Sequence, residues 1–170
     1  MDEDKINKLP PDVKKQFIKY ALKLSEKKKK TKVNDDFLTF VKHVWPEFIE
    51  GRHHKEIADK FNDIANKKIK RLIINMPPRH TKSEFASFLL PAWMVGRRPN
   101  LKIIQTTHTT ELAIRFGRKA KTLMDSQEYK EVFDTRLRED SQAAGKWETE
   151  QGGEYYAAGV GSAITGRGAD

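Results

Sequence analysis

One short loop constrains the fold of this chain more than any other feature: Pro77-Pro78-Arg79-His80-Thr81-Lys82-Ser83. The loop follows a short apolar stretch, residues 72–76, and precedes a segment of helical character, residues 84–95. A strand, a tight loop, a Lys-Ser pair and a helix, in that order, are typical of a loop that cradles phosphates. The sequence therefore predicts an α/β fold with a phosphate site at the start of a helix.

The match to the pattern G-x-x-x-x-G-K-S/T is partial. Met76 and Thr81 stand where the pattern has glycines, and only Lys82-Ser83 fits it. Thr81 adds a Cβ where close approach to phosphate favours glycine, which is tolerated when φ is negative. The alternative is an ordinary strand-to-helix turn stiffened by Pro77 and Pro78. The pattern by itself leaves both interpretations open.

Lys82 and Ser83 are the residue types that a bound triphosphate requires. Lys82 is expected to reach the outer phosphates of ATP, and the Ser83 hydroxyl to complete the ligand shell of Mg²⁺. Unpaired N–H groups and the helix dipole would favour negative charge there. The competing roles are a solvated lysine at a helix start and N-capping by Ser83.

Composition bounds the class of protein. A chain of 170 residues is long enough for one domain with a core, and no apolar run approaches the roughly 20 residues of a membrane span. The acidic start, Met1-Asp2-Glu3-Asp4, lacks the features of a signal peptide. The absence of cysteine excludes disulfides and thiolate metal sites, which suits an intracellular protein.

The charge balance favours an anionic partner. The net charge is +9, from 33 Lys and Arg against 24 Asp and Glu, and such a surplus suits nucleic acid. The basic residues gather in three blocks, at 27–32, 67–71 and 115–121. Because each block could equally be a solvated helix end or a linker, basicity permits nucleic-acid binding without establishing it.

Apolar spacing predicts an α-helical N-terminal part ahead of the loop. Three helices are expected, with Asn34 capping the second, at 10–26, 34–46 and 52–67. The lysine block after the first helix reads as an exposed linker. The predicted divisions are a helical arm with a basic linker at 1–33, a helical lead-in at 34–69, and an ATPase region at 70–170.

The region from residue 70 alternates strands and helices. Strands are expected at 71–75 and 101–106, each followed by a helix, the second capped by Thr109 or Thr110, with a short helix at 128–133. This order predicts a parallel sheet with right-handed crossovers. Gly152-Gly153 then separates two candidate hairpin strands, 146–150 and 154–158, before a glycine-rich loop at 159–170.

Several blocks together resemble the front of the ATPase domain of tailed-bacteriophage terminase large subunits. They are Arg71 to His80 with Lys82-Ser83, Phe116-Gly117-Arg118, Gly159-Val160-Gly161 through Thr165 to Asp170, and upstream Trp45-Pro46, Gly51 to His54 and Ile57-Ala58. The resemblance covers about residues 35 to 170.

The resemblance implies a P-loop NTPase fold of the ASCE or RecA-like kind, with an incomplete parallel sheet. It implies ATP and Mg²⁺ as cofactors and ATP-driven packaging of double-stranded DNA into procapsids. The implied partners of the complete protein are DNA, the portal, a small terminase subunit and a homo-oligomeric ring, with no membrane. The implied location is the cytoplasm of the infected host cell and, transiently, the procapsid portal.

The resemblance also sets the expected site. Arg79 joins Lys82 as a candidate catalytic residue that could stabilise phosphoryl charge or instead form a surface salt bridge, and His54 lies where the adenine is expected, with capping or packing as its alternative role. The expected nucleotide-binding residues are Pro78, Arg79, His80, Thr81, Lys82, Ser83, Glu84 and His54, with Ser83 as metal ligand. The family's Walker B strand, catalytic Glu and nuclease domain would lie beyond Asp170, so this chain would carry half an active site.

Two other functional classes stay open from the sequence. One is an inactive truncated or split fragment, such as a frameshift product or the segment upstream of an intron or intein. The other is a P-loop nucleic-acid-binding protein that uses its basic surface without turnover.

Overall fold

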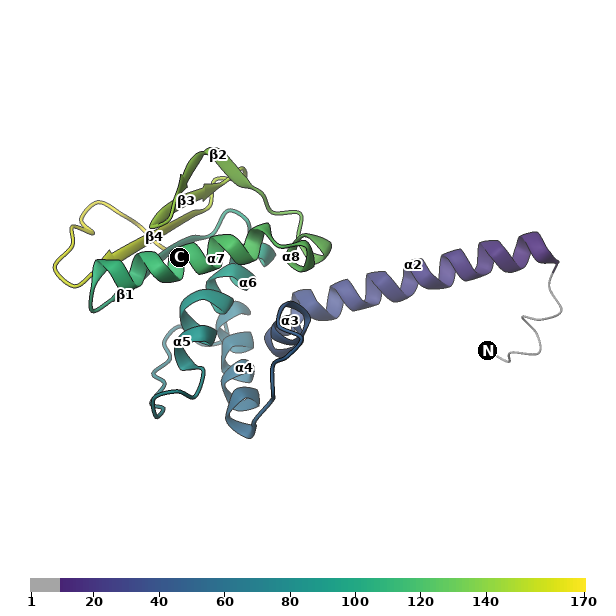
Figure 1. Ribbon diagram of the computed structural model, residues 1–170, viewed down its shortest axis with the longest axis horizontal. Helices are drawn as coiled ribbons and strands as arrows, with labels where there is room; N and C mark the ends of the chain where they lie inside the picture. Colours follow the sequence, from purple (N-terminus) through teal and green to yellow (C-terminus); the bar gives the residue numbers. More distant parts are fainter. Residues whose placement is uncertain (1–9) are drawn as a thin grey trace.

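The protein combines helices with one small sheet. The computed structural model describes residues 10–170, and Figure 1 shows the strands gathered at one end of the body, with helices beneath and beside them. Residues 1–9 of the predicted N-terminal arm lie outside this range. The prediction of an α/β fold is confirmed at this level.

The first described helix, α2 (Pro11–Asp35), extends away from the rest of the molecule (Figure 1). Pro11 occupies its first turn, where a missing N–H costs nothing. The prediction of a linker at the lysine block is wrong, because residues 27–32 lie within this helix. Lysine is a good helix former, and the next proline after the helix start is Pro46. Between residues 10 and 170, no helix is both long enough and apolar enough to cross a membrane.

Truncating α2 is expected to leave the stability of the body unchanged. Removal of residues 1–23 should shift the thermal midpoint by no more than about 2 °C, because Val33 is the first buried residue of this helix. Circular dichroism melts of the parent and the shortened chain measure this. A control truncation that also removes Val33, which is 1% exposed, should lower the midpoint clearly. An equal fall in both would show that the projecting half of α2 supports the core.

Helices α3 (Phe37–Val44) and α4 (Arg52–Ala65) are joined at their ends by polar side chains. The N-cap of α3 is Asp36, whose carboxylate accepts from Thr39 N at 2.8 Å, so the prediction of Asn34 as the cap is wrong. Asn62 of α4 accepts from Phe37 N at 2.9 Å and donates to Asp36 Oδ1 at 2.8 Å. These bonds fix α4, which ends two residues earlier than predicted, against the start of α3.

Aromatic rings join the helices into one core. The Phe37 ring packs edge-on against Phe61, Phe85 and Trp93, with ring centroids 5.1, 5.4 and 5.4 Å away. Trp93 has no exposed surface, and its indole Nε1 donates to Val33 O at 3.1 Å. This contact anchors the C-terminal end of α2 to the core.

The sheet has four strands in the order β1-β4-β3-β2. They are β1 (Lys102–Thr107), β2 (Leu137–Ala143), β3 (Lys146–Thr149) and β4 (Glu154–Gly159). Only β1 and β4 pair in parallel, and the other pairs are antiparallel. The prediction of a parallel sheet is therefore wrong for most of it, whereas the β3–β4 hairpin is confirmed.

Two helices connect β1 to the hairpin strands. They are α7 (Thr110–Asp125), which packs against β1 and β4, and α8 (Gln127–Val132). Thr109 caps α7 by accepting from Leu112 N, as predicted. The carbonyl of Gly117 accepts a hydrogen bond from the indole of Trp147 at 3.3 Å. Helix α7 thus covers one face of the sheet.

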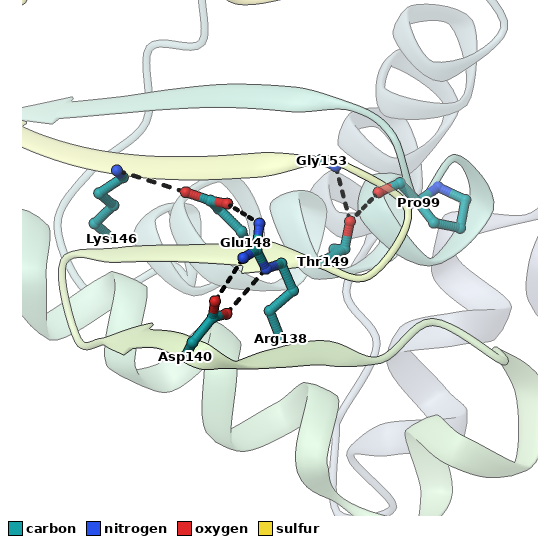
Figure 2. A network of polar contacts seen from close by, with 7 residues as sticks. All are labelled: Pro99, Arg138, Asp140, Lys146, Glu148, Thr149 and Gly153. Carbon is teal, nitrogen blue, oxygen red and sulfur yellow. Dashed lines mark hydrogen bonds and ion pairs between the residues drawn. The ribbon is translucent and has the colours of Figure 1, made fainter.

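A charged network runs along β2 and β3 (Figure 2). Arg138 donates to both Asp140 oxygens and to Glu148, which also pairs with Lys146 at 3.5 Å. The hydrogen bond from Arg138 lowers the pKa of the Asp140 carboxyl. These pairs connect the edge strand β2, which the sequence did not predict, to its neighbour.

The strand predicted at 71–75 is absent. Residues 71–77 have no regular secondary structure and pair with no strand of the described chain. Leu72, Ile74 and Met76 pack against the core, whereas Arg71 and Ile73 between them are exposed. The alternation is that of a strand, but a strand also needs a hydrogen-bonding neighbour, and this segment has none.

Candidate functional site

The loop leads directly into a long helical segment. This segment consists of α5 (Lys82–Glu84), the π-helix η1 (Phe85–Leu89) and α6 (Leu90–Arg97). Pro91 lies inside it, so a stop before Pro91, one of two predicted ends, is wrong, and the helix ends near Gly96 as the other predicted. The wider π turn ahead of Pro91 removes one conventional hydrogen bond in the region where proline cannot donate.

Backbone donors are free at the start of this helix. Thr81 is the N-cap residue, and its carbonyl accepts from Phe85 N at 2.9 Å. The N–H groups of Lys82, Ser83 and Glu84 have no acceptor among residues 10–170. Such orphan donors, together with the helix dipole, make a helix start favourable for an anion.

The two residues that fit the sequence pattern lie at this start. Lys82 and Ser83 are both exposed. The Lys82 ammonium donates to Met76 O at 3.4 Å, so its side chain folds back across the loop toward Met76. The Lys82 charge thus lies at the loop that precedes the free N–H groups.

Two loop residues have left-handed backbone conformations without being glycine. Arg79 has φ of 64° and Thr81 has φ of 58°. A β-branched residue with positive φ is uncommon, and it persists only where its surroundings stabilise it. Thr81 thus has the backbone conformation that favours glycine, rather than the negative φ at which a side chain is easily tolerated.

His54 contacts this strained residue. Its Nδ1 accepts from Gly51 N at 2.8 Å, which places the proton of a neutral ring on Nε2. Nε2 donates to Thr81 Oγ1 at 2.6 Å, and that hydroxyl donates to His80 O at 2.6 Å. Both ring nitrogens are therefore used within the protein.

The surroundings of His54 are mostly apolar and keep it neutral. The side chain is only 6% exposed, and its ring lies 4.8 Å from that of Phe48 and 5.2 Å from that of Phe85. Burial lowers the pKa of His54, and the neighbouring His53 and His80 lower it further, while Glu50 raises it. The adjacent His53 ring has a buried Nε2 without a hydrogen-bond partner among the described residues.

The remaining predicted site residues differ in their surroundings. Arg79 is exposed and has no ion-pair partner in the described part of the chain. The Pro78 carbonyl accepts from His80 Nδ1 at 2.8 Å, which tightens the turn. Glu84 is held by Lys119 of α7, whose ammonium lies 3.0 Å from both carboxylate oxygens. Arg79 is thus free to meet a ligand, whereas Glu84 is engaged within the protein.

The donor set suits Mg²⁺ that arrives with a nucleotide. No three His, Asp or Glu side chains of residues 10–170 come together as a metal site. Mg²⁺ binds well through one or two protein ligands when phosphates and water supply the others. The exposed hydroxyl of Ser83, at the helix start beside Lys82, would supply one such ligand.

Two contacts at the site were not foreseen from the sequence. The His54–Thr81 bond joins residues 27 positions apart, and the Lys119–Glu84 pair joins residues 35 positions apart. Neither has a signal in local spacing.

In the glycine-rich loop, Arg167 pairs with Glu154 at 2.6 Å and lies over the Tyr156 ring at 3.8 Å, so it holds that loop against β4.

Comparison with known proteins gave no relative: no protein-family model, no curated protein and no solved structure matches this chain.

Proposed function

We propose that this chain binds the phosphates of ATP at the loop 76–83 and is the ATP-binding part of a DNA-packaging ATPase like the terminase large subunits it resembles. One observation carries the proposal. The N–H groups of Lys82, Ser83 and Glu84 are free at the start of a helix, and the Lys82 side chain reaches back across the loop that precedes them. In the same proposal, the fold is the first part of a P-loop NTPase domain.

The chemistry of the loop follows from its charges. The free N–H groups would donate to phosphate oxygens, and Lys82 would add a charge-assisted hydrogen bond. Bound Mg²⁺ would neutralise phosphate charge, with Ser83 among its ligands. Arg79, exposed and unpaired within residues 10–170, would stabilise the charge that develops on the transferred phosphoryl group.

The resemblance supplies the rest of the proposal. Double-stranded DNA is the proposed substrate of translocation, with the portal, a small subunit and further copies of the protein as partners in the infected cell. The net charge of +9 supports a polyanionic partner. Phosphate binding is the step that the described loop residues would perform, so nucleotide binding is the activity to test in this chain.

A titration with a fluorescent ATP analogue tests the proposed site. We expect saturable binding that is tighter with Mg²⁺, and a Lys82→Ala substitution should weaken it about 10- to 100-fold, because a charge-assisted hydrogen bond contributes about 1.5–3 kcal/mol. The measurement is fluorescence anisotropy of the parent and the variant, with and without Mg²⁺.

Lys70→Ala is the matched control, because Lys70 is an exposed lysine just outside the loop. It should bind the analogue as the parent does. Equal weakening by both substitutions would reduce the effect to general electrostatics and contradict the proposed site. Absence of binding in the parent would favour the inactive fragment, and binding of DNA alone would favour the nucleic-acid-binding alternative.

A further inference from the structure

We infer that His54 positions the phosphate loop: through the Thr81 hydroxyl it holds the left-handed backbone that this loop uses in place of a glycine. The inference deepens the proposed function and rests on it, since the loop is taken to bind phosphate. His54 in this role does not contact the nucleotide. It acts through Thr81, at the residue that immediately precedes the free N–H groups.

The hydrogen-bond chain that supports this role is continuous. Gly51 N donates to His54 Nδ1 at 2.8 Å, Nε2 donates to Thr81 Oγ1 at 2.6 Å, and that hydroxyl donates to His80 O at 2.6 Å. The chain thus runs from the start of α4 to the peptide between His80 and Thr81. It restrains both the side chain of Thr81 and the backbone that precedes it.

The energetic need for such support comes from the backbone of Thr81. A left-handed conformation with φ of 58° is unfavourable for a β-branched residue, so without restraint the backbone would relax toward negative φ. Relaxation at Thr81 would turn the following N–H groups away from their common direction. A glycine at this position would need no such restraint.

The rigid surroundings of His54 make it an effective anchor. The ring is 6% exposed and lies against Phe48 and Phe85, which fix its orientation. Because both nitrogens are engaged inside the protein, the ring has no donor left for adenine. The geometry therefore favours positioning over direct nucleotide contact.

Protonation gives this role a distinctive signature. A protonated imidazole carries hydrogen on both nitrogens, so it can no longer accept from Gly51 N. The titratable groups that face His54 are His53 on the same helix, His80 of the loop and Glu50 of the segment before α4. Because burial lowers the pKa of His54, the anchored form is complete above the unfolded-state pKa of about 6.5 and is lost as pH falls through the folded-state pKa.

Three substitutions at Thr81 test the inference in the full chain. Thr81→Val keeps the shape but lacks the hydroxyl, and it should weaken binding of the Mg²⁺–ATP analogue about tenfold, as expected for the loss of a partly buried hydrogen bond. Thr81→Ser keeps the hydroxyl and should bind within about twofold of the parent. Thr81→Gly should bind at least as well as the parent, since glycine adopts the conformation unaided.

A double-mutant cycle then tests the link itself. His54→Phe preserves ring packing and should also weaken binding about tenfold, but combined with Thr81→Val the loss should stay near tenfold instead of reaching about a hundredfold. In the Thr81→Gly background, His54→Phe should have no effect on affinity. Between pH 8 and 5, the advantage of the parent over His54→Phe should shrink as His54 becomes protonated.

A ligand-free measurement separates this inference from the proposed function. The same cycle, followed by thermal midpoints without nucleotide, should show the same non-additivity, and nitrogen-15 NMR should show the Nε2–H form of His54. Additive effects, or a Thr81→Val variant equal to Thr81→Ser in both affinity and midpoint, would overturn the inference. Coupled midpoints in a parent that binds no nucleotide would retain the link and reject its role in phosphate binding.

Discussion

Replacing Trp93 with alanine is expected to cost about 3–5 kcal/mol of folding free energy, as for other fully buried tryptophans. Trp93 has no exposed surface, and its ring lies 5.4 Å from the Phe37 ring and 4.7 Å beneath the Arg97 guanidinium. Its indole also satisfies the carbonyl of Val33. The substitution therefore leaves a cavity where α2, α3 and α6 meet, and it removes the hydrogen bond that the indole donates to Val33 O.

Chemical denaturation of the parent and of Trp93→Ala gives the free energy of unfolding directly. Trp45→Ala is the control, since Trp45 is half-buried at the edge of the core, where its ring packs at a tilt against Phe48. We expect it to lose about 1–2 kcal/mol. If the two variants lost the same free energy, Trp93 would not be the centre of the core.

Helices and strands whose apolar residues recur at a regular spacing can be predicted from the sequence. The spacing itself marks the face that packs against the rest of the protein. The sequence predicts helix α7 with its cap at Thr109 or Thr110, and it predicts β1, β3 and β4 at 101–106, 146–150 and 154–158. Edge strand β2 has few apolar residues, and the side-chain contact that joins it to β3, between Arg138 and Glu148, links residues ten positions apart. Local pattern gives no sign of such a pair.

The segment 71–75 shows the opposite case. Its composition is that of a strand, and its side chains alternate between the core and solvent as in a strand. The sheet, however, ends at β1, and the segment pairs with no strand of the described chain. Composition reports the preference of a segment, whereas strand formation depends on a neighbour that the segment does not contain.

The candidate site likewise combines features that the local sequence predicts with features that depend on residues far apart in the chain. The order of loop, Lys82, Ser83 and helix is local, so the sequence was sufficient to locate the helix start. The backbone of Thr81 and its bond to His54 depend on how α4 packs under the loop. Local spacing therefore does not predict that Thr81 is left-handed or that His54 holds its side chain.

Replacing Gly153 with alanine is expected to cost about 1–3 kcal/mol, because the position has no room for a Cβ. An added Cβ would lie 2.8 Å from Leu101 O and closer still to Pro99 O. Gly153 also donates to Thr149 Oγ1 at 2.8 Å, and that hydroxyl donates to Pro99 O at 2.5 Å (Figure 2). Movement at this residue would disturb the start of the parallel pairing between β1 and β4.

Substitutions at two other glycines serve as controls, because they separate the effect of crowding at Cβ from the effect of backbone strain. Gly168 has open space around it and no positive φ, so Gly168→Ala should change the free energy of unfolding by less than about 0.5 kcal/mol. Gly152 also has open space but a φ of 85°, so Gly152→Ala should cost about 1 kcal/mol through backbone strain alone. A Gly153→Ala variant as stable as Gly168→Ala in denaturant titrations would show that the 149–153 turn yields freely. The close approach of Pro99 and Thr149 would then contribute nothing to holding β4 beside β1.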